Sequence, residues 1–263
     1  DSVSLLSSLM DSLLDAGASI VNLIAVAHAL QPADAEHRFG HGKAEPLAGL
    51  VQAAFITGSA LFLVIEAGHR LFSPVPVAQT TIGIAVIVFS IAVTLALVLF
   101  QRYVVRKTGS VAIAADSVHY QSDLLMNAGV IAALVLSGNL GLAIADPVIA
   151  IAIAGYIVYG AYGIGKDSLD QLMDKEMPVE DRLRIREIAM GVKGVHGLHE
   201  LRTRLSGRQA FIQLHLELPP DMSLKQAHGI AEAVMHKLER AFPGSEVLVH
   251  EDPEGVPERR RPV

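Results

Sequence analysis

The sequence predicts a bundle of transmembrane α-helices followed by a small α+β domain, on three observations. Of the 263 residues, 51% are hydrophobic and only 18% are charged, which is an apolar composition for a soluble protein. The charges concentrate in the C-terminal part: residues 166–263 hold fifteen Lys or Arg and seventeen Asp or Glu, against six and ten in residues 1–165. The apolar part contains five runs that are each long enough to cross a bilayer as a helix.

The five predicted spans are residues 8–30, 46–72, 81–103, 112–137 and 143–165. Lys and Arg occur in the connections 31–45 and 102–111 but not in 138–146. By the positive-inside rule, the first two connections and the segment after the last span are therefore cytoplasmic. Five spans in this orientation would begin outside the cell. We therefore expect the chain to be truncated relative to a six-span parent, with five of its six spans visible.

Beyond residue 176 the pattern is that of a soluble domain with the order α-β-β-α-β. Pro178 and Ser223 are positioned to begin two helices, and alternating polarity predicts three strands at residues 199–205, 210–218 and 245–250. This order gives a ferredoxin-like, metallochaperone-like sheet with its helices on one side. The predicted divisions are a transmembrane domain (1–165), a linker at the membrane surface (166–176), a cytoplasmic domain (177–252) and a disordered tail (253–263).

Four ionisable residues inside the apolar runs predict a metal site. Asp11 and Asp15 in the first run, and His119 and Asp123 in the fourth, are each four residues apart, so each pair shares one helix face. Ionisable groups at membrane depth usually face a partner or a pathway. Two helices that turn these pairs toward each other would form a four-ligand site for Zn2+, or for Mn2+, Fe2+, Co2+, Ni2+ or Cd2+. The alternative is that these are ordinary buried polar groups bonded across helices.

The same ligands suggest how transport could be driven. Metal binding requires ionised carboxylates and a neutral His119, so protons compete with the metal for the site. A site of this kind that opened alternately to the two sides would exchange metal for protons. Antiport is therefore a hypothesis, with His119 as the proton-coupling residue.

Two further clusters have metal-ligand spacing. Asp34, His37 and His41 lie in the first cytoplasmic connection and would form a second site, or equally a solvated polar turn. The third cluster is in the soluble domain, where alternation puts His215 on the strand face opposite its apolar neighbours and puts His250 and Asp252 on one side of the last strand. His199 opens the first strand and His228 lies beside the apolar stripe of the second helix. Scattered surface histidines are the alternative explanation for this cluster.

Several classes of function find no support. The chain has no cysteine, so disulfides and thiolate metal ligands are excluded. A net charge of -6 without a clustered basic face gives no support to nucleic-acid binding. The rival functions are a membrane metal sensor and an intramembrane metallohydrolase, although a hydrolase needs an open metal position and no H-E-x-x-H motif is present. The four histidines without a patterned partner are predicted to be interfacial or surface groups: His28, His69, His196 and His236.

The two i,i+4 pairs, followed by an α-β-β-α-β domain, resemble the cation diffusion facilitator family. Segments 10–17, 37–45, 199–204, 242–246 and 249–253 also match it, and the resemblance covers nearly the whole chain. It implies a homodimeric zinc/proton antiporter of the bacterial inner membrane that moves Zn2+ outward and protons inward. It also implies that Lys43 and Asp174 form a charge interlock between the subunits at the membrane surface.

The resemblance assigns three metal sites to residues of this chain. It implies a transport site at Asp11, Asp15, His119 and Asp123. It implies a loop site at Asp34, His37 and His41. It implies a binuclear site in the cytoplasmic domain, with Asp252 as the bridging ligand, made by His199, His215, His228, His250 and Asp252. The ions in the cytoplasmic domain would be structural or regulatory, whereas the ion at the transport site is the substrate.

Overall fold

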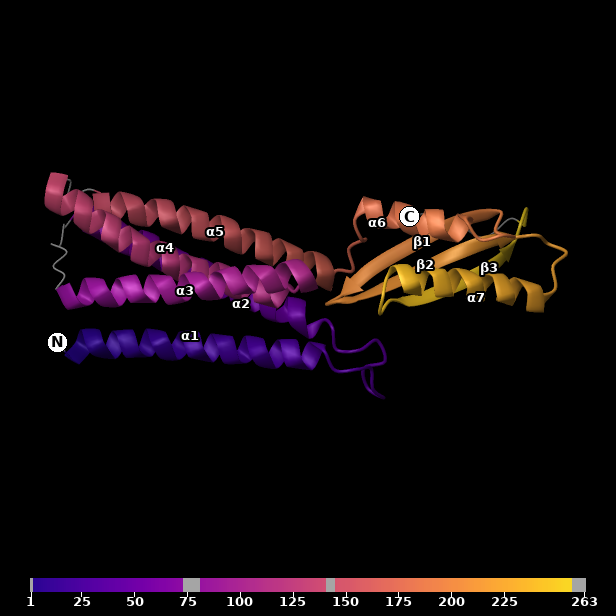
Figure 1. Cartoon of the computed structure of the whole chain (residues 1–263), viewed down its shortest axis with the longest axis horizontal. Coiled ribbons are helices and arrows are strands. Elements are labelled where there is room, and N and C mark those ends of the chain that lie inside the picture. Colours follow the sequence, from indigo (N-terminus) through magenta and orange to yellow (C-terminus); the bar gives the residue numbers. More distant parts are fainter. Residues whose placement is uncertain (1, 73–80, 141–144, 257–263) are drawn as a thin grey trace. The chain divides into compact units, whose positions relative to one another are not determined.

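The computed structural model of the chain describes residues 2–72, 81–140 and 145–256. Within these ranges, the side chains of 2–12, 14, 70, 72, 81–84, 133–140, 145 and 146 are not described. The chain divides into two units, Asp1–Leu169 and Asp170–Val263. The first is helical and the second contains the sheet (Figure 1), as the sequence predicts.

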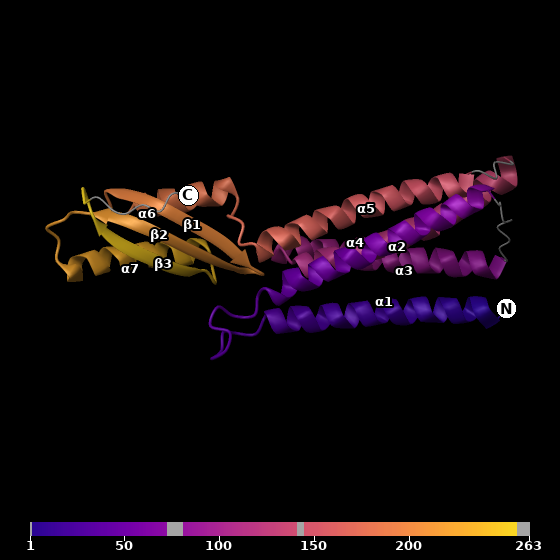
Figure 2. The same ribbon diagram turned by 180° about the vertical axis from the view of Figure 1, so that it is seen from behind.

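Five long helices make up the first unit: α1 (Ser2–Ala29), α2 (Ala44–Phe72), α3 (Thr81–Thr108), α4 (Val111–Leu140) and α5 (Ala145–Leu172). They lie side by side in both views (Figures 1 and 2). Three contain a stretch that is long and apolar enough to cross a membrane, namely Ala44–His69, Ala85–Thr108 and Pro147–Leu172. Helix α1 contains a shorter apolar stretch, Asp15–Ala29, and α4 carries the polar residues of the predicted site. The α5 helix extends past the predicted span into the expected linker.

The surface and the interior of this bundle differ as expected for a protein in lipid. Large apolar side chains point outward, and Phe62, Phe89 and Phe100 are 70%, 71% and 63% exposed. Small residues are buried between the helices; a Cβ atom added at Gly129 would approach Ile153 Cδ1 to 2.7 Å. Close helix contacts through small residues are the usual way in which membrane helices associate.

The second unit has the predicted order α-β-β-α-β: α6 (Val179–Met190), β1 (Gly197–Ser206), β2 (Gln209–Leu218), α7 (Leu224–Ala241) and β3 (Glu246–Pro253). The strand order is β1-β2-β3, with β1 and β2 antiparallel and β2 and β3 parallel. Ser223 caps α7 in a capping box with Gln226, as its side chain predicts. The third strand is longer than the sequence predicts, because it pairs with β2 through Pro253 opposite Leu218.

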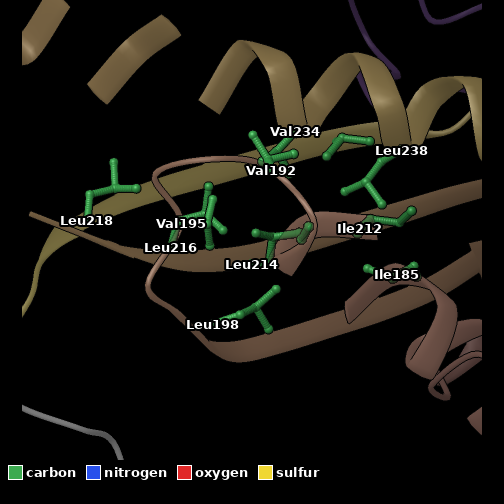
Figure 3. Close-up of a cluster of buried hydrophobic side chains, with 12 residues drawn as sticks. Ile185, Val192, Val195, Leu198, Ile212, Leu214, Leu216, Leu218, Val234 and Leu238 are labelled. Carbon is green, nitrogen blue, oxygen red and sulfur yellow. The ribbon is translucent and has the colours of Figure 1, made fainter. Parts of the chain in front are cut away.

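The core of this domain lies on one face of the sheet. Ile212, Leu214 and Leu216 alternate along β2 and are at most 1% exposed, and they pack against Val234 and Leu238 of α7 (Figure 3). Ile185 of α6 joins the same cluster. Because side chains alternate along a strand, the residues between these leucines, including His215, belong to the other face of the sheet.

Candidate metal centres

The first cluster joins α1 to α4 inside the helical unit. Nε2 of His119 lies 3.1 Å from Oδ1 of Asp15 and 3.8 Å from Oδ2 of Asp123. One ligand atom from each of the three lies within 4.8 Å of the others, and the side chain of His119 is only 19% exposed. The two helices thus bring an imidazole and two carboxylates to one point, which is three quarters of the predicted transport site.

Asp11 is the fourth predicted ligand of this site, and its side chain lies outside the described residues. It belongs to α1, one turn before Asp15. The face that α1 turns toward α4 is set by two polar contacts: Ser19 Oγ and Tyr120 Oη are 3.0 Å apart, and Asn22 Nδ2 donates to the carbonyl of Ala112 at 3.2 Å. The place of Asp11 in this site therefore stays a prediction from its spacing to Asp15.

The second cluster lies in the connection between α1 and α2. His37 Nδ1 is 3.6 Å from Asp34 Oδ1, and His41 Nε2 is 3.4 Å from Asp34 Oδ2. The three residues offer ligand atoms within 4.8 Å of one another, so the structure brings the predicted loop residues together. The His41 side chain is 5% exposed, which is unusual for a group in a solvated turn. Within the described residues, its Nδ1 atom is buried and has no hydrogen-bond partner.

Backbone amides hold Asp34 in its ionised form. Its Oδ1 accepts hydrogen bonds from the backbone N–H groups of His37 at 2.7 Å and Glu36 at 2.9 Å. The bond from His37 is the main reason why the pKa of the Asp34 carboxyl lies below its usual value of 3.8, because hydrogen bonds to the charged form favour it. The carboxylate is therefore ready to bind a cation without first losing a proton.

The third cluster is a row of histidines across the exposed face of the sheet. His199 on β1 lies opposite His215 on β2, which lies opposite His250 on β3. A bulge in β1 follows His199, where the pairing shifts before Arg202 and Glu200 takes a left-handed φ of 46°. A bulge re-aims the strand that contains it, and here it separates His199 from the regular pairing further along β1.

Asp252 lies at the centre of this row. Its Oδ2 atom is 2.7 Å from His215 Nδ1 and 3.4 Å from His199 Nε2, whereas its Oδ1 atom is 3.0 Å from His250 Nε2. The carboxylate is 7% exposed and the His250 side chain is 63% exposed. Both oxygens of one buried carboxylate therefore face imidazoles, which is the arrangement that a carboxylate bridging two cations requires.

One residue of this cluster has no counterpart in the sequence predictions. Glu217 Oε1 lies 3.1 Å from His199 Nδ1, on the side of the ring away from Asp252. A carboxylate on the second nitrogen of a ligating histidine fixes the ring orientation and raises its basicity. The sequence could have indicated Glu217, because it follows His215 by two residues and so lies on the same face of the strand.

His228 is not brought to this row. It is 69% exposed on α7, with its Nε2 atom 3.9 Å from Glu232. Helix α7 packs on the sheet face that carries Leu214, whereas the histidines line the opposite face. The group that the described residues form consists of His199, His215 and Asp252, with His250 against Asp252 at one edge.

The two residues of the predicted charge interlock are in different units. Asp174 has a left-handed φ of 56°, and its Oδ1 atom accepts from Arg204 at 3.2 Å within the sheet-containing unit. Lys43 lies directly before α2. The pairing of Lys43 with Asp174 therefore stays a prediction about two copies of the chain.

Comparison with known proteins gives the family directly. Residues 1–173 match the cation efflux transmembrane domain, and residues 177–254 match the cytoplasmic domain of cation efflux proteins. Two curated relatives, both named cation-efflux pump FieF, come from Yersinia pestis (strain Pestoides F) and Yersinia pseudotuberculosis serotype O:3 (strain YPIII). Each is 50% identical over 260 residues, which cover 99% of this chain and 86% of the relative.

Two solved structures that are similar to part of this chain are smaller than it. The zinc form of CzrB is 30% identical and covers 33% of this chain and 99% of that chain, with a TM-score of 0.29. A manganese form of the MamM CTD is 31% identical and covers 28% of this chain and 94% of that chain, with a TM-score of 0.27.

The family assignment rests on the sequence matches, which extend through both units of the chain. The resemblance read from the paired Asp and His residues is confirmed by these matches. The chain belongs to the cation efflux family, also called the cation diffusion facilitator family, and is a membrane protein with a C-terminal cytoplasmic domain.

Proposed function

We propose that this chain exports a divalent transition-metal ion, Zn2+ in the first place, in exchange for protons. The observation that carries the proposal is the meeting of Asp15, His119 and Asp123 between two helices of the transmembrane domain. Imidazole and carboxylate ligands suit Zn2+, and also Cd2+, Fe2+ or Mn2+. The relatives named cation-efflux pump support the direction of transport. Asp11 is the fourth ligand in this proposal.

The contact between His119 and Asp15 supports coupling to protons. A nitrogen and a carboxylate oxygen 3.1 Å apart need one proton between them, because an ionised carboxylate and an unprotonated ring nitrogen are both acceptors. A metal ion bound at Nε2 needs that lone pair, so its arrival expels the proton. In this proposal the proton shared by His119 and Asp15 leaves the site when a metal ion enters, rather than moving to Nδ1 of the ring, and a proton returns when the metal ion leaves.

Alternating access would turn this exchange into antiport. When the site faces the cytoplasm, metal replaces the proton; when it faces outward, protons replace the metal. The proton gradient of the bacterial inner membrane then drives efflux. His119 is the residue that we propose couples the two fluxes, because it is the member of the cluster that must change from N–H donor to metal ligand.

The cytoplasmic cluster is proposed to hold two regulatory or structural ions in a homodimer. The two Asp252 oxygens face different histidines, which supports a bridging role for this carboxylate. The match of residues 177–254 to a dimerisation domain supports the homodimer. His228, as a further ligand, and the interlock of Lys43 with Asp174 across the dimer are parts of the same proposal.

Transport in sealed vesicles tests the proposal. Protein reconstituted in proteoliposomes should take up Zn2+ faster when a pH gradient is imposed, and Asp15→Ala should abolish uptake while dimer formation persists. The matched control is Asp116→Asn, because Asp116 lies on α4 near His119 but accepts from Gln101 at 2.7 Å outside the cluster. Uptake that ignores the pH gradient would rule out proton coupling, and full activity of Asp15→Ala would rule out the site.

A further inference from the structure

His28 was expected to be an isolated interfacial residue, and the structure places it against the loop cluster. It lies in the last turn of α1. The centroid of its ring is 4.5 Å from that of His41, with the rings at 63° to each other. The rings of His37 and His41 are also 4.5 Å apart. The ring of His28 is therefore as close to that of His41 as the ring of His37 is, although its nitrogens do not belong to the group of ligand atoms within 4.8 Å that Asp34, His37 and His41 form.

These separations are close to those expected for imidazoles that bind the same ion, or neighbouring ions that share a ligand. Two imidazoles that bind a tetrahedral Zn2+ at about 2.0–2.1 Å through one nitrogen each have ring centroids about 5 Å apart. In the cytoplasmic cluster, the rings of His215 and His250 are 4.6 Å apart and those of His199 and His215 are 5.2 Å apart. The His28–His41 pair falls in the same range as pairs that surround the Asp252 carboxylate.

The burial of His41 indicates that the cluster is built around something besides its own side chains. The His41 side chain is 5% exposed, and its Nδ1 atom is buried with no hydrogen-bond partner in the part of the chain that the structure describes. Leaving a buried polar atom unpaired costs roughly 1–3 kcal/mol. A cation bound at Nδ1 removes that cost, and it leaves Nε2, which lies 3.4 Å from Asp34 Oδ2, to interact with the carboxylate.

The geometry points to His28 as the fourth ligand of the loop site, which then consists of three imidazoles and the Asp34 carboxylate. The exposed His28 side chain can turn about its own torsions to bring a nitrogen to the ion. With four protein ligands the site is closed, so the ion is held rather than passed through an open position. It would also tie the end of α1, the helix that carries Asp15, to the connection that follows.

This inference rests on the proposed metal chemistry of the loop and does not require transport. It is tested with Co2+, whose tetrahedral complexes absorb visible light far more strongly than complexes with five or six ligands. The protein is the full chain with the other two clusters disabled by Asp15→Ala, His119→Ala, His215→Ala and Asp252→Ala. We expect one Co2+ per chain with the strong absorption of a four-coordinate site.

Two substitutions of His28 separate coordination from packing. His28→Phe keeps a ring against His41 but has no nitrogen, and His28→Ala removes both. Both should convert the strong absorption to the weak one, because the open position admits more than one water and the ion becomes five- or six-coordinate. Both should also weaken Co2+ binding at least about 10-fold, since even outer-shell partners change affinity by roughly 10–100-fold. His69→Ala, which removes an exposed histidine of α2, should change neither.

The outcomes that overturn the inference are distinct from those that would overturn transport. Unchanged absorption in His28→Phe would show that His28 is not a ligand, even if affinity fell. Strong absorption that survives Asp34→Ala would show that the ion is not in the loop. Neither result bears on Zn2+ uptake in proteoliposomes, which is measured with the other clusters intact.

Discussion

Asp15 and His119 are 104 residues apart in the chain, and their side chains meet at 3.1 Å between α1 and α4. Among the residues that the structure describes, His119 is the only imidazole of this cluster. The contact links it to a carboxylate on a different helix. Movement of α1 relative to α4 would therefore open or close the metal position directly. In the proposed transport site, the binding of the ion and the packing of the two helices would therefore be coupled at this one contact.

The identity of the residue at position 119 should set metal preference. His119→Asp would leave a site of oxygen ligands, which favour harder cations such as Mn2+ and Mg2+ over Zn2+. We expect the ratio of Zn2+ to Mn2+ uptake to fall by at least about 10-fold, a change of about 1.4 kcal/mol in relative binding. Competitive uptake in proteoliposomes measures the ratio. A ratio equal to that of the unmodified chain would mean that His119 does not contact the transported ion.

Acid should release metal from the loop site through the imidazoles and not through Asp34. The pKa of Asp34 lies below 3.8 because backbone N–H groups donate to its carboxylate. A group with a lowered pKa contributes its charge above the ordinary value and loses it only as pH falls through the lowered one. Release of metal that is complete at a higher pH would therefore come from protonation of ligands other than Asp34.

The measurement for the loop is a parallel titration. The carboxyl 13C signal of Asp34 in the detergent-solubilised chain should titrate with its midpoint below 3.8, while Co2+ bound at the loop should be lost at a higher pH. The Asp116→Asn variant is a suitable control, since it removes a carboxylate far from the loop in sequence. A carboxyl signal that moved together with metal release would contradict this account.

Zinc should stabilise the cytoplasmic domain through Asp252. At a free Zn2+ concentration about 100 times the dissociation constant, a single site adds about 2.7 kcal/mol to the free energy of unfolding. Asp252→Asn should remove most of this gain, because the amide cannot bridge two cations. Thermal unfolding of the cytoplasmic domain, followed with and without a chelator, measures the difference. Equal metal-induced shifts in the unmodified and Asp252→Asn proteins would exclude the bridging role.

The assignment of His228 has a matched control on the same helix. His228 and His236 are 69% and 71% exposed, and each lies 3.9 Å from Glu232. If His228 is a ligand in the assembled dimer, then His228→Ala should lower the zinc-induced stabilisation whereas His236→Ala should not. Calorimetry of the two variants with Zn2+ gives the comparison. Equal behaviour of the two variants would remove His228 from the site.

The core of the cytoplasmic domain should be sensitive to lost volume at β2. Leu214 is 1% exposed and packs in the cluster between the sheet and α7. Leu214→Ala should lower the free energy of unfolding of this domain by about 2–5 kcal/mol, because it removes buried methyl groups and leaves a cavity. Leu248→Ala, at a 61% exposed position on β3, should cost far less. Chemical denaturation of the cytoplasmic domain measures the free energy of unfolding of both variants.

Much of the architecture could be predicted because its signals are local. The apolar runs set the helices of the first unit, and the capping residue Ser223 together with the alternation along β2 set the elements of the second. That His119 and Asp123 share one face could also be predicted, because both residues lie on a single helix. Each of these features depends on residues a few positions apart, so the sequence contains the whole pattern.

The missed residues depend on how the chain turns back on itself. His28 precedes His37 by nine residues and follows no helical or strand spacing with it, so only the path of the connection brings its ring to His41. Glu217 pairs with His199 because two antiparallel strands place them together. His228, which was predicted as a ligand, lies beside the apolar stripe of α7 and is 69% exposed; because α7 covers the opposite side of the sheet, this chain alone does not bring it to the histidine row.

The sequence by itself determined the two domains, the order of the elements and the residue types able to bind a divalent metal, because hydrophobic burial and helix or strand periodicity are properties of short segments. The tertiary structure decided which of those residues meet. Asp15 reaches His119, and Asp252 reaches three histidines, only when helices and strands far apart in the chain pack together. A metal site is a convergence of side chains within a few ångströms, and that convergence is set by packing between elements, which spacing within one element does not specify.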